Sequence, residues 1–356
     1  MFSISHQGEG LEHVVILRDD ENRTEVHVAV GYGFNAFSFK IGTENGVADL
    51  LYAEGGFPRA DLRATANGTP ILVPFPNRIA GGKFIYDGKT YTLPCNDHGV
   101  NAIHGFAFDK PWRIVEESTG DFPPSIVGEF EMLRDSPLTE KHWPGNFRVR
   151  CEIKLYGKTL DQRFTITNLS DRRIPFGLGT HPYFRLADDL DQCGIIVDAM
   201  SLVELEKTIP TGRTTPVDNE TRLALPYTFD GLSGLAPVPI GSRSLDHVYT
   251  GLRGESDPQR RVVLPFSHHI FDQRNGSTIL TTLSHFNDFP YVVVYIPPHR
   301  KAICIEPYTC VTNAVNLGDW LGPDGPLTGL WHLQPGEERT TTISMSATIH
   351  RSEDAE

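Results

Sequence analysis

Two ionisable side chains stand in local sequences that could support proton transfer. His181 lies in the segment Phe176–Phe184, where the proline that follows it favours an extended backbone and holds the imidazole in a defined conformation. Glu306 follows the apolar segment Ala302–Ile305 and precedes Pro307, which predicts a carboxylate at the end of a buried strand. Desolvation there would raise its pKa toward the range of a general base.

His104 and Asp246 are two further candidates, in the segments 101–106 and 244–249. Each of the four residues also has an ordinary structural interpretation. A histidine can be satisfied inside the core, a carboxylate at a strand end can turn to solvent, and a loop residue can lack any role. Local sequence alone leaves both interpretations open.

Other common site chemistries lack their motifs in this chain. There are 14 histidines and five scattered cysteines, without Cys-x-x-Cys, His-x-His or His-Glu-x-x-His spacing, so we predict reduced thiols and no metal. No Gly-x-Ser-x-Gly elbow is present. The segment 88–90 imitates the end of a P-loop with its first glycine misplaced, and the glycines of 31–36 precede a strand-like pattern where a dinucleotide fingerprint needs a helix.

Composition narrows the possible partners. Lys and Arg total 32 against 45 Asp and Glu, a formal charge of −13, which disfavours nucleic acid and anionic membrane surfaces. No apolar stretch reaches the ~20 residues of a membrane-spanning helix. Because the N-terminus has neither a basic region nor an apolar core typical of a signal peptide, we expect a cytoplasmic protein.

The hydrophobic pattern favours strands throughout the chain. Alternation of period two predicts half-buried strands, and denser β-branched runs predict strands buried on both faces. The half-buried strands are expected at 25–30, 34–41, 147–155, 163–167 and 342–349, and the fully buried ones at 291–296 and 302–305. Asp87 and Gly88 supply the turn of a hairpin over 83–93, and no long helical stripe is present.

These elements predict an all-β protein built as a large antiparallel β-sandwich with few short helices. The 33 glycines and 26 prolines are spread along the chain, and no repeat or composition shift divides it. We therefore expect a single domain over residues 1–350 and a polar C-terminal tail over 351–356.

Taken together, the segments around the candidate residues resemble the aldose 1-epimerases, or galactose mutarotases, in their order and neighbours. The matching segments are Pro76-Asn-Arg-Ile79 with the following hairpin, Asn101-Ala-Ile-His-Gly105, Ser136-Pro137 with Pro144-Gly-Asn146, Thr180-His-Pro-Tyr-Phe184, Leu245-Asp-His247, and Ile305-Glu-Pro307 with Asn313-Ala-Val-Asn316. The resemblance spans residues 30 to 350.

The resemblance implies the galactose mutarotase-like sandwich, with a sugar bound in an open cleft on one sheet. The reaction it implies interconverts the α and β anomers of a free aldohexose such as galactose or glucose. A base removes the proton of the anomeric hydroxyl while an acid protonates the ring oxygen, so no cofactor or metal is needed. The implied partner is a monosaccharide, and the chain is expected to be a monomer or a homodimer.

Carried over position by position, the resemblance makes Glu306 the base and His181 the acid. A glutamate near its reference pKa is charged at neutral pH, and a histidine near 6.5 needs only modest help to hold a proton. His104 is implied as a second donor near the ring oxygen. Asn77, Arg78 and Asp246 are implied as contacts to sugar hydroxyls.

Two departures from the family pattern leave the substrate open. Arg185 follows His181-Pro-Tyr-Phe184 where Asn is common, and Tyr308 stands where Gln is common. One alternative is a hexose-6-phosphate 1-epimerase, for which Arg185, Arg213 and Lys207 could meet the phosphate. The other alternative is a non-catalytic carbohydrate-binding protein of the same fold. Trp143 and Tyr183 are possible apolar contacts for a sugar ring, or simply core residues.

Overall fold

The computed structural model describes residues 1–229, 232–253, 256–257, 262–263, 265–274, 277–322 and 325–351. Strands dominate this part of the chain, and its only α-helix is the single turn α1 (Met132–Asp135). No helix within these ranges is long and apolar enough to cross a membrane. The all-β prediction is therefore confirmed.

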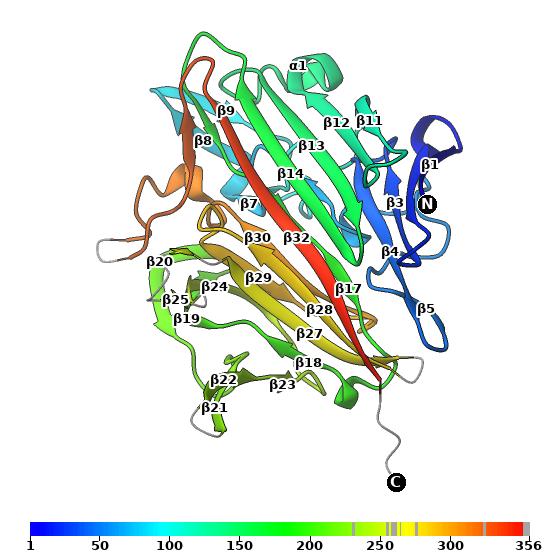
Figure 1. Ribbon diagram of the computed structural model, residues 1–356. Coiled ribbons are helices and arrows are strands. Elements are labelled where there is room, and N and C mark those ends of the chain that lie inside the picture. Colours follow the sequence, from blue (N-terminus) through cyan, green and yellow to red (C-terminus); the bar gives the residue numbers. More distant parts are fainter. Residues whose placement is uncertain are drawn as a thin grey trace.

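Three larger antiparallel sheets make up the body of the molecule (Figure 1). The first has five strands in chain order: β1 (Phe2–Gln7), β2 (Val14–Asp19), β3 (Thr24–Ala29), β4 (Asn35–Thr43) and β5 (Gly46–Asp49). The second has nine, in the order β11 (Arg113–Ser118), β12 (Ser125–Glu131), β13 (Phe147–Tyr156), β14 (Thr159–Asn168), β32 (Glu338–Arg351), β28 (Ser277–His285), β27 (Phe266–Arg274), β18 (Gly194–Ile196) and β23 (Val238–Pro239). In Figure 1, β32 runs through the middle of this sheet, between β14 and β28.

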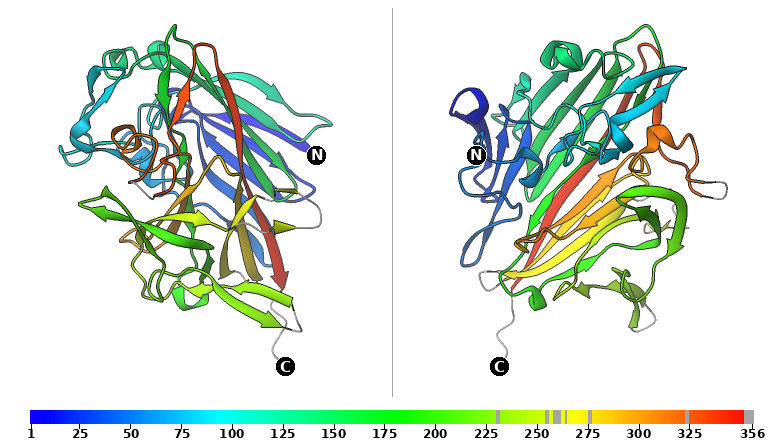
Figure 2. Two further views of the ribbon diagram at one scale, coloured as in Figure 1. Left: turned by 90° about the vertical axis from the view of Figure 1, so that its left-hand side faces the viewer. Right: turned by 180° about the vertical axis from the view of Figure 1, so that it is seen from behind.

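The third sheet has eight strands and positions the candidate site. Its order is β20 (Ile209–Pro216), β19 (Ala199–Glu206), β24 (Asp246–Leu252), β29 (Tyr291–Tyr295), β30 (Ala302–Tyr308), β16 (Gly179–Thr180) and β6 (Ile71–Leu72), with β17 (Tyr183–Arg185) also paired to β30. Seen from behind, the chain that forms β7 to β10 lies close to this sheet (Figure 2, right).

Five two-stranded ladders complete the described part of the fold. They are β7 (Arg78–Ile79) with β10 (Ala102–Ile103), β8 (Lys83–Tyr86) with β9 (Lys89–Thr92), β15 (Ile174–Phe176) with β31 (Trp331–Leu333), β21 (Leu225–Phe229) with β22 (Leu232–Ala236), and β25 (Ser256–Asp257) with β26 (Val262–Val263). The β8–β9 pair is the predicted hairpin, with positive φ at Asp87 and Gly88.

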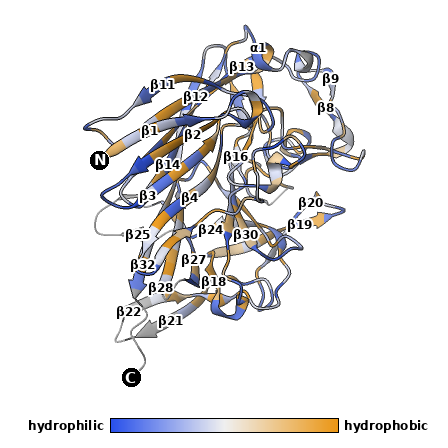
Figure 3. Ribbon diagram, turned by 90° about the vertical axis from the view of Figure 1, so that its right-hand side faces the viewer, coloured by the Kyte–Doolittle hydropathy of each residue, from blue (hydrophilic) through white to orange (hydrophobic). Residues whose placement is uncertain are grey.

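The predicted strand positions agree with those observed. The segments predicted from alternation correspond to β3, β4, β13, β14 and β32, and alternate burial along β13 shows why their patterns have period two. Apolar residues line the strands that enclose the core (Figure 3). The segment after residues 31–36 is strand β4, as the rejection of a dinucleotide fingerprint predicts.

Strands β29 and β30 are buried on both faces. One face packs against the main core, and the opposite face carries the candidate site. Val292, Val294, Ile303 and Ile305 point into the main apolar core. The residues between them point the other way, because side chains alternate across a sheet. Cys304, Glu306 and Tyr308 therefore share one face of β30, away from the main core.

The ends of β30 and β32 differ from those expected. Glu306 was expected at the end of its strand, but β30 continues to Tyr308, so the carboxylate lies inside a strand in which every residue is buried. Arg351, expected to begin a polar tail, is the last residue of β32 and pairs with Ser277. Residues 352–356 of that expected tail lie outside the described residues.

Candidate active site

His181 and Glu306 face each other at the centre of the eight-stranded sheet. The distance between His181 Nε2 and Glu306 Oε1 is 3.4 Å, and the side chains are only 9% and 3% exposed. Glu306 comes from β30, and His181 lies in the two-residue break between β16 and β17, both of which pair with β30. Residues distant in sequence thus form one buried acid–base pair.

Glycines in the segment before His181 make room for this arrangement. Gly179 lies opposite Tyr308 in the ladder, and a Cβ at position 179 would stand 2.4 Å from Tyr308 Cδ1. A Cβ at position 177 would stand 2.5 Å from Cys310 Sγ. Both distances are far below van der Waals contact, so close packing against β30 and the residues just after it requires glycine at these two positions.

His104 lies beside the pair on a different element, immediately after β10. Its ring centroid is 5.7 Å from that of His181, with the rings nearly perpendicular. The backbone N–H of Asn77 donates to His104 Nδ1 at 3.2 Å, and the backbone N–H of His104 donates to the Asn77 carbonyl at 2.9 Å. Because Nδ1 accepts, a neutral His104 carries its proton on Nε2 and can donate there.

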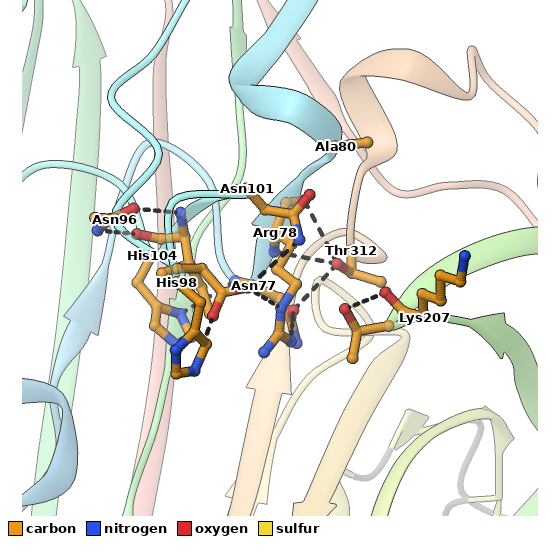
Figure 4. Close-up of polar contacts among 12 residues, drawn as sticks. Asn77, Arg78, Ala80, Asn96, His98, Asn101, His104, Lys207 and Thr312 are labelled. Carbon is orange, nitrogen blue, oxygen red and sulfur yellow. Dashed lines mark hydrogen bonds and ion pairs between the residues drawn. The ribbon is translucent and has the colours of Figure 1, made fainter.

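Arg78 is held at the edge of the site by the side chains of Asp97 and Asn77, and Figure 4 shows it beside Asn77. Its Nε donates to Asp97 Oδ2 at 2.8 Å, and a terminal nitrogen donates to Asn77 Oδ1 at 3.1 Å. Thr312 Oγ1 donates to the same Asn77 oxygen at 3.1 Å. The Arg78 side chain is 23% exposed, so part of it could meet a ligand.

Exposed charges lie within electrostatic range of the pair. Asp246 begins β24, and its charge raises the pKa of Glu306. Arg63 lies in the loop before β6, and its charge lowers the pKa values of His181 and His104. Both side chains are exposed, which places polar groups of opposite sign around the buried centre.

Burial is the main influence on the protonation of the pair. It raises the pKa of Glu306 well above its usual value, with the charge of Asp246 adding to the rise and Tyr308 and Arg78 opposing it. It lowers the pKa of His181 to about 3. Burial therefore favours neutral forms of both residues, whereas the reference pKa values led us to expect a charged glutamate beside a readily protonated histidine.

His104 is also neutral, because burial lowers its pKa well below 6.5 and the charges of His181 and Arg78 add to that effect. A neutral imidazole with a proton on Nε2 remains a hydrogen-bond donor over a wide pH range. The donor role expected for His104 stays a prediction.

The two aromatic candidates separate clearly. Tyr183 stacks on His181, with ring centroids 4.6 Å apart and an interplanar angle of 2°. Trp143 is 2% exposed and packs against Phe75 and Phe84 in the main core. Of the two, Tyr183 adjoins the site and Trp143 is a core residue.

The residues considered for phosphate binding do not form a free cationic cluster. Arg213 pairs with Glu204, with 2.7 Å between Nε and Oε2. The Arg185 guanidinium lies over the Tyr52 ring at 5.2 Å and donates to the Leu51 carbonyl at 3.3 Å. Lys207 is exposed at the turn between β19 and β20.

One group of side chains in the described part of the chain could hold a metal ion: His181, Cys304 and Glu306, whose donor atoms lie within 4.8 Å of one another. Burial and the Glu306 charge raise the pKa of the Cys304 thiol well above its usual value, so the thiolate ligand is disfavoured. Glu306 Oε2 is already engaged by Tyr308. We assign no metal to this group, and the expectation of metal-free chemistry stays a prediction.

Sequence reasoning named Tyr308 only as a departure from the family pattern, and it missed Cys304 and Arg63 as neighbours of the pair. The hydroxyl of Tyr308 donates to Glu306 Oε2, and Cys304 lies beside the same carboxylate. The sequence held a signal for Cys304 and Tyr308. Each lies two positions from Glu306, and residues two apart on a strand point to the same face. Arg63 has no comparable signal, because only the folded chain brings its loop to His181.

Comparison with known proteins agrees with this fold. The family model for aldose 1-epimerase matches residues 55–346. Galactose mutarotase of Sus scrofa is 32% identical over 149 residues, which are 40% of each chain, and the uncharacterized protein YphB of Escherichia coli K12 is 30% identical over 119 residues, 33% of this chain and 36% of YphB. These two alignments therefore span well under half of each relative.

A solved structure extends the likeness of fold to nearly the whole chain. The galactose mutarotase-like protein of Clostridium acetobutylicum has a TM-score of 0.80 and 19% identity, and the match covers 98% of this chain and 99% of that one. The β-sandwich is thus of the galactose mutarotase-like type. With the family model matched over most of its length, the chain belongs to the aldose 1-epimerase family.

Proposed function

We propose that this protein is an aldose 1-epimerase that interconverts the α and β anomers of a free aldohexose such as galactose or glucose. Glu306 Oε1 removes the proton from the anomeric hydroxyl, and His181 Nε2 gives a proton to the ring oxygen. The C1–ring oxygen bond breaks, the C1–C2 bond rotates, and the ring closes on the other face of the aldehyde. The reverse proton transfers then restore the pair.

The 3.4 Å approach of His181 to Glu306 is the observation that carries this proposal. The anomeric and ring oxygens are bonded to the same carbon, so their base and acid must lie only a few ångströms apart. The pair shares one exchangeable proton. Neutral Glu306 beside neutral His181 and the Glu306 carboxylate beside the His181 imidazolium contain the same total number of protons and differ only in where this proton lies. A sugar hydroxyl that donates to Glu306 favours the carboxylate, and the proton then resides on His181.

The surrounding residues supply binding and orientation. His104 donates from Nε2 near the ring oxygen, while Arg78 and Asp246 at the edge of the site form hydrogen bonds with sugar hydroxyls. Asn77 orients both His104 and Arg78 through the bonds described above. The ring of Tyr183 holds His181 in place by stacking.

An unphosphorylated substrate is favoured over a hexose 6-phosphate. A phosphate dianion is normally met by several free Arg or Lys groups. Arg213 and Arg185 are engaged elsewhere, which leaves Lys207 alone among the three residues considered. A protein that only binds sugars would not require an acid and a base in one buried pair. Because one fold can host both enzymes and binding proteins, such a pair is what favours an enzyme here.

The test follows the optical rotation of freshly dissolved α-D-glucose and α-D-galactose with the wild-type protein and with Glu306→Gln and His181→Asn. We expect acceleration by the wild type and a loss of roughly 10²- to 10⁴-fold in each variant, the usual contribution of a placed acid or base. The exposed residues Glu21 and His98 give the matched controls Glu21→Gln and His98→Asn, which should retain activity. Activity should also survive EDTA.

Failure of the wild type to accelerate either relaxation would refute the proposal for simple sugars. Measurement with glucose 6-phosphate and isothermal titration with free sugars would then separate a phosphate-specific epimerase from a binding protein. Activity lost in EDTA and restored by zinc would refute the metal-free mechanism.

A further inference from the structure

The two oxygens of the Glu306 carboxylate have different surroundings. Oε1 lies 3.4 Å from His181 Nε2, on the side where the substrate must react. Oε2 accepts a hydrogen bond from the hydroxyl of Tyr308, which is completely buried two residues along the same strand. Oε1 is therefore the oxygen that faces the histidine of the pair, while Oε2 already accepts a hydrogen bond.

The ring of Tyr308 is itself held firmly in place. It belongs to an apolar cluster with Leu72, Val293 and Leu321, and Gly179 leaves no space between the strands for movement toward β16. A hydroxyl carried by so constrained a ring presents its donor at a defined position. Its hydrogen bond can then fix the plane of the carboxylate as well as occupy one oxygen.

We propose that Tyr308 is a positioning residue for the base, holding Glu306 by Oε2 so that Oε1 takes the substrate proton, and stabilising the carboxylate form in a buried site. This inference rests on the proposed function for its kinetic consequence, although the hydrogen bond itself can be tested without it. It also gives the departure from the family pattern at position 308 a physical meaning. A tyrosine donates to the base from a rigid ring, where Gln would donate from a flexible amide.

The charge environment supports this role. Burial strongly disfavours the Glu306 carboxylate, and the charge of Asp246 on β24 disfavours it further. The Tyr308 hydrogen bond is the largest of the influences that lower the pKa of Glu306, ahead of the charge of Arg78 on β7. The other titratable groups facing this carboxylate are Cys304 on β30, His181 between β16 and β17, Tyr183 on β17 and Tyr295 on β29.

The kinetic experiment compares Tyr308→Phe, Tyr308→Gln and Tyr291→Phe with the wild type. Tyr291 is the cross-strand partner of Tyr308 and is equally buried, but its hydroxyl donates to the Leu327 carbonyl at 2.6 Å, so its loss is a matched control. The measurements are kcat and KM for mutarotation between pH 4 and 9, with circular dichroism to verify folding.

For Tyr308→Phe we expect kcat at neutral pH to fall roughly 10- to 100-fold, as for a hydrogen bond to a charged group, with KM changing less than about threefold. The acidic limb of the pH profile should move upward by roughly one unit, because loss of a donor to the carboxylate raises its pKa. Tyr308→Gln should restore most of the activity, and Tyr291→Phe should keep the wild-type profile. An unchanged acidic limb in folded Tyr308→Phe would overturn the inference.

Two further results keep the inference testable. If Tyr308→Phe does not fold, Tyr308→Gln decides, and a folded but inactive Gln variant contradicts a role based on hydrogen-bond donation. If the wild type shows no epimerase activity, carbon-13 NMR titration of the Glu306 carboxyl, assigned with Glu306→Gln, still measures the effect. The same carboxyl pKa in wild type and Tyr308→Phe would refute the inference whatever the substrate.

Discussion

A buried histidine pair should make the protein labile to mild acid. His268 on β27 and His285 on β28 are diagonal neighbours in the ladder, with 2.9 Å between their Nε2 atoms, and both are nearly inaccessible. His285 Nδ1 lies 3.2 Å from the carbonyl of Phe286, so Nδ1 donates to that carbonyl and Nε2 accepts a hydrogen bond from His268 Nε2. If His285 were also protonated on Nε2, that N–H would point at the N–H of His268, and this repulsion inside the core disfavours the charged form.

The size of the effect follows from the pKa of His285, which burial lowers from 6.5 to about 4. Below pH 6.5 the unfolded chain takes up a proton that the folded protein refuses, so stability falls as pH decreases and levels off near pH 4. At pH 5 this one group lowers the free energy of unfolding by about 2 kcal/mol, against a typical total of about 5–15 kcal/mol. His181, whose pKa is lowered to about 3, has the same sign, whereas Glu306, whose pKa is raised, has the opposite sign.

The variant His285→Gln isolates this contribution. Urea unfolding followed by tryptophan fluorescence at pH 7 and pH 5 gives the free energy of unfolding of each protein at each pH. The variant loses hydrogen bonds at both pH values, so the informative quantity is the decrease in the free energy of unfolding from pH 7 to pH 5. This decrease should be smaller in the variant than in wild type by about 2 kcal/mol. His98→Gln, on a side chain that is 94% exposed, should leave the difference unchanged. Equal pH dependence in wild type and His285→Gln would refute the reasoning.

Three further outcomes test the packing and charges of the site. Gly179→Ala places a methyl group 2.4 Å from a Tyr308 ring atom, so the free energy of unfolding should fall by about 1–3 kcal/mol and activity should fall with it; unchanged stability in urea would contradict the packing. Arg63→Gln removes a cation that lowers the pKa of His181, so NMR titration should show that pKa rising, and a fall would contradict the charge argument. Asp246→Asn removes a charge that raises the pKa of Glu306 and a predicted sugar contact, so the acidic limb should move to lower pH while KM increases, and an unchanged KM would remove Asp246 from the sugar site.

Much of the fold could be predicted from local pattern. Period-two alternation reports which face of a strand is buried, and this is a property of the strand itself, so β13 was found almost to its ends and the middle of β32 was found as residues 342–349. The turn at Asp87 and Gly88 was equally local. Pairing order was not local, since β32 at the end of the chain lies between β14 and β28.

The candidate acid and base could be chosen from the sequence, through their unusual settings and the family resemblance. Their burial and their protonation states could not be predicted in this way. Position 306 reads as a strand end because Pro307 follows, yet β30 continues and encloses the carboxylate. Burial by residues from other strands then shifts both pKa values toward the neutral forms, which reference values for isolated side chains cannot show.

The sequence by itself determined which residue types are available and which faces of the strands are apolar, because both are properties of short segments. Only the tertiary structure decided which of these residues meet. It brings His181 to 3.4 Å from Glu306, sets the loop of Arg63 within electrostatic range, and places Gly179 where the ring of Tyr308 can reach the base. Proximity and desolvation depend on segments far apart in the chain, and together they make an ordinary glutamate and histidine a candidate catalytic pair.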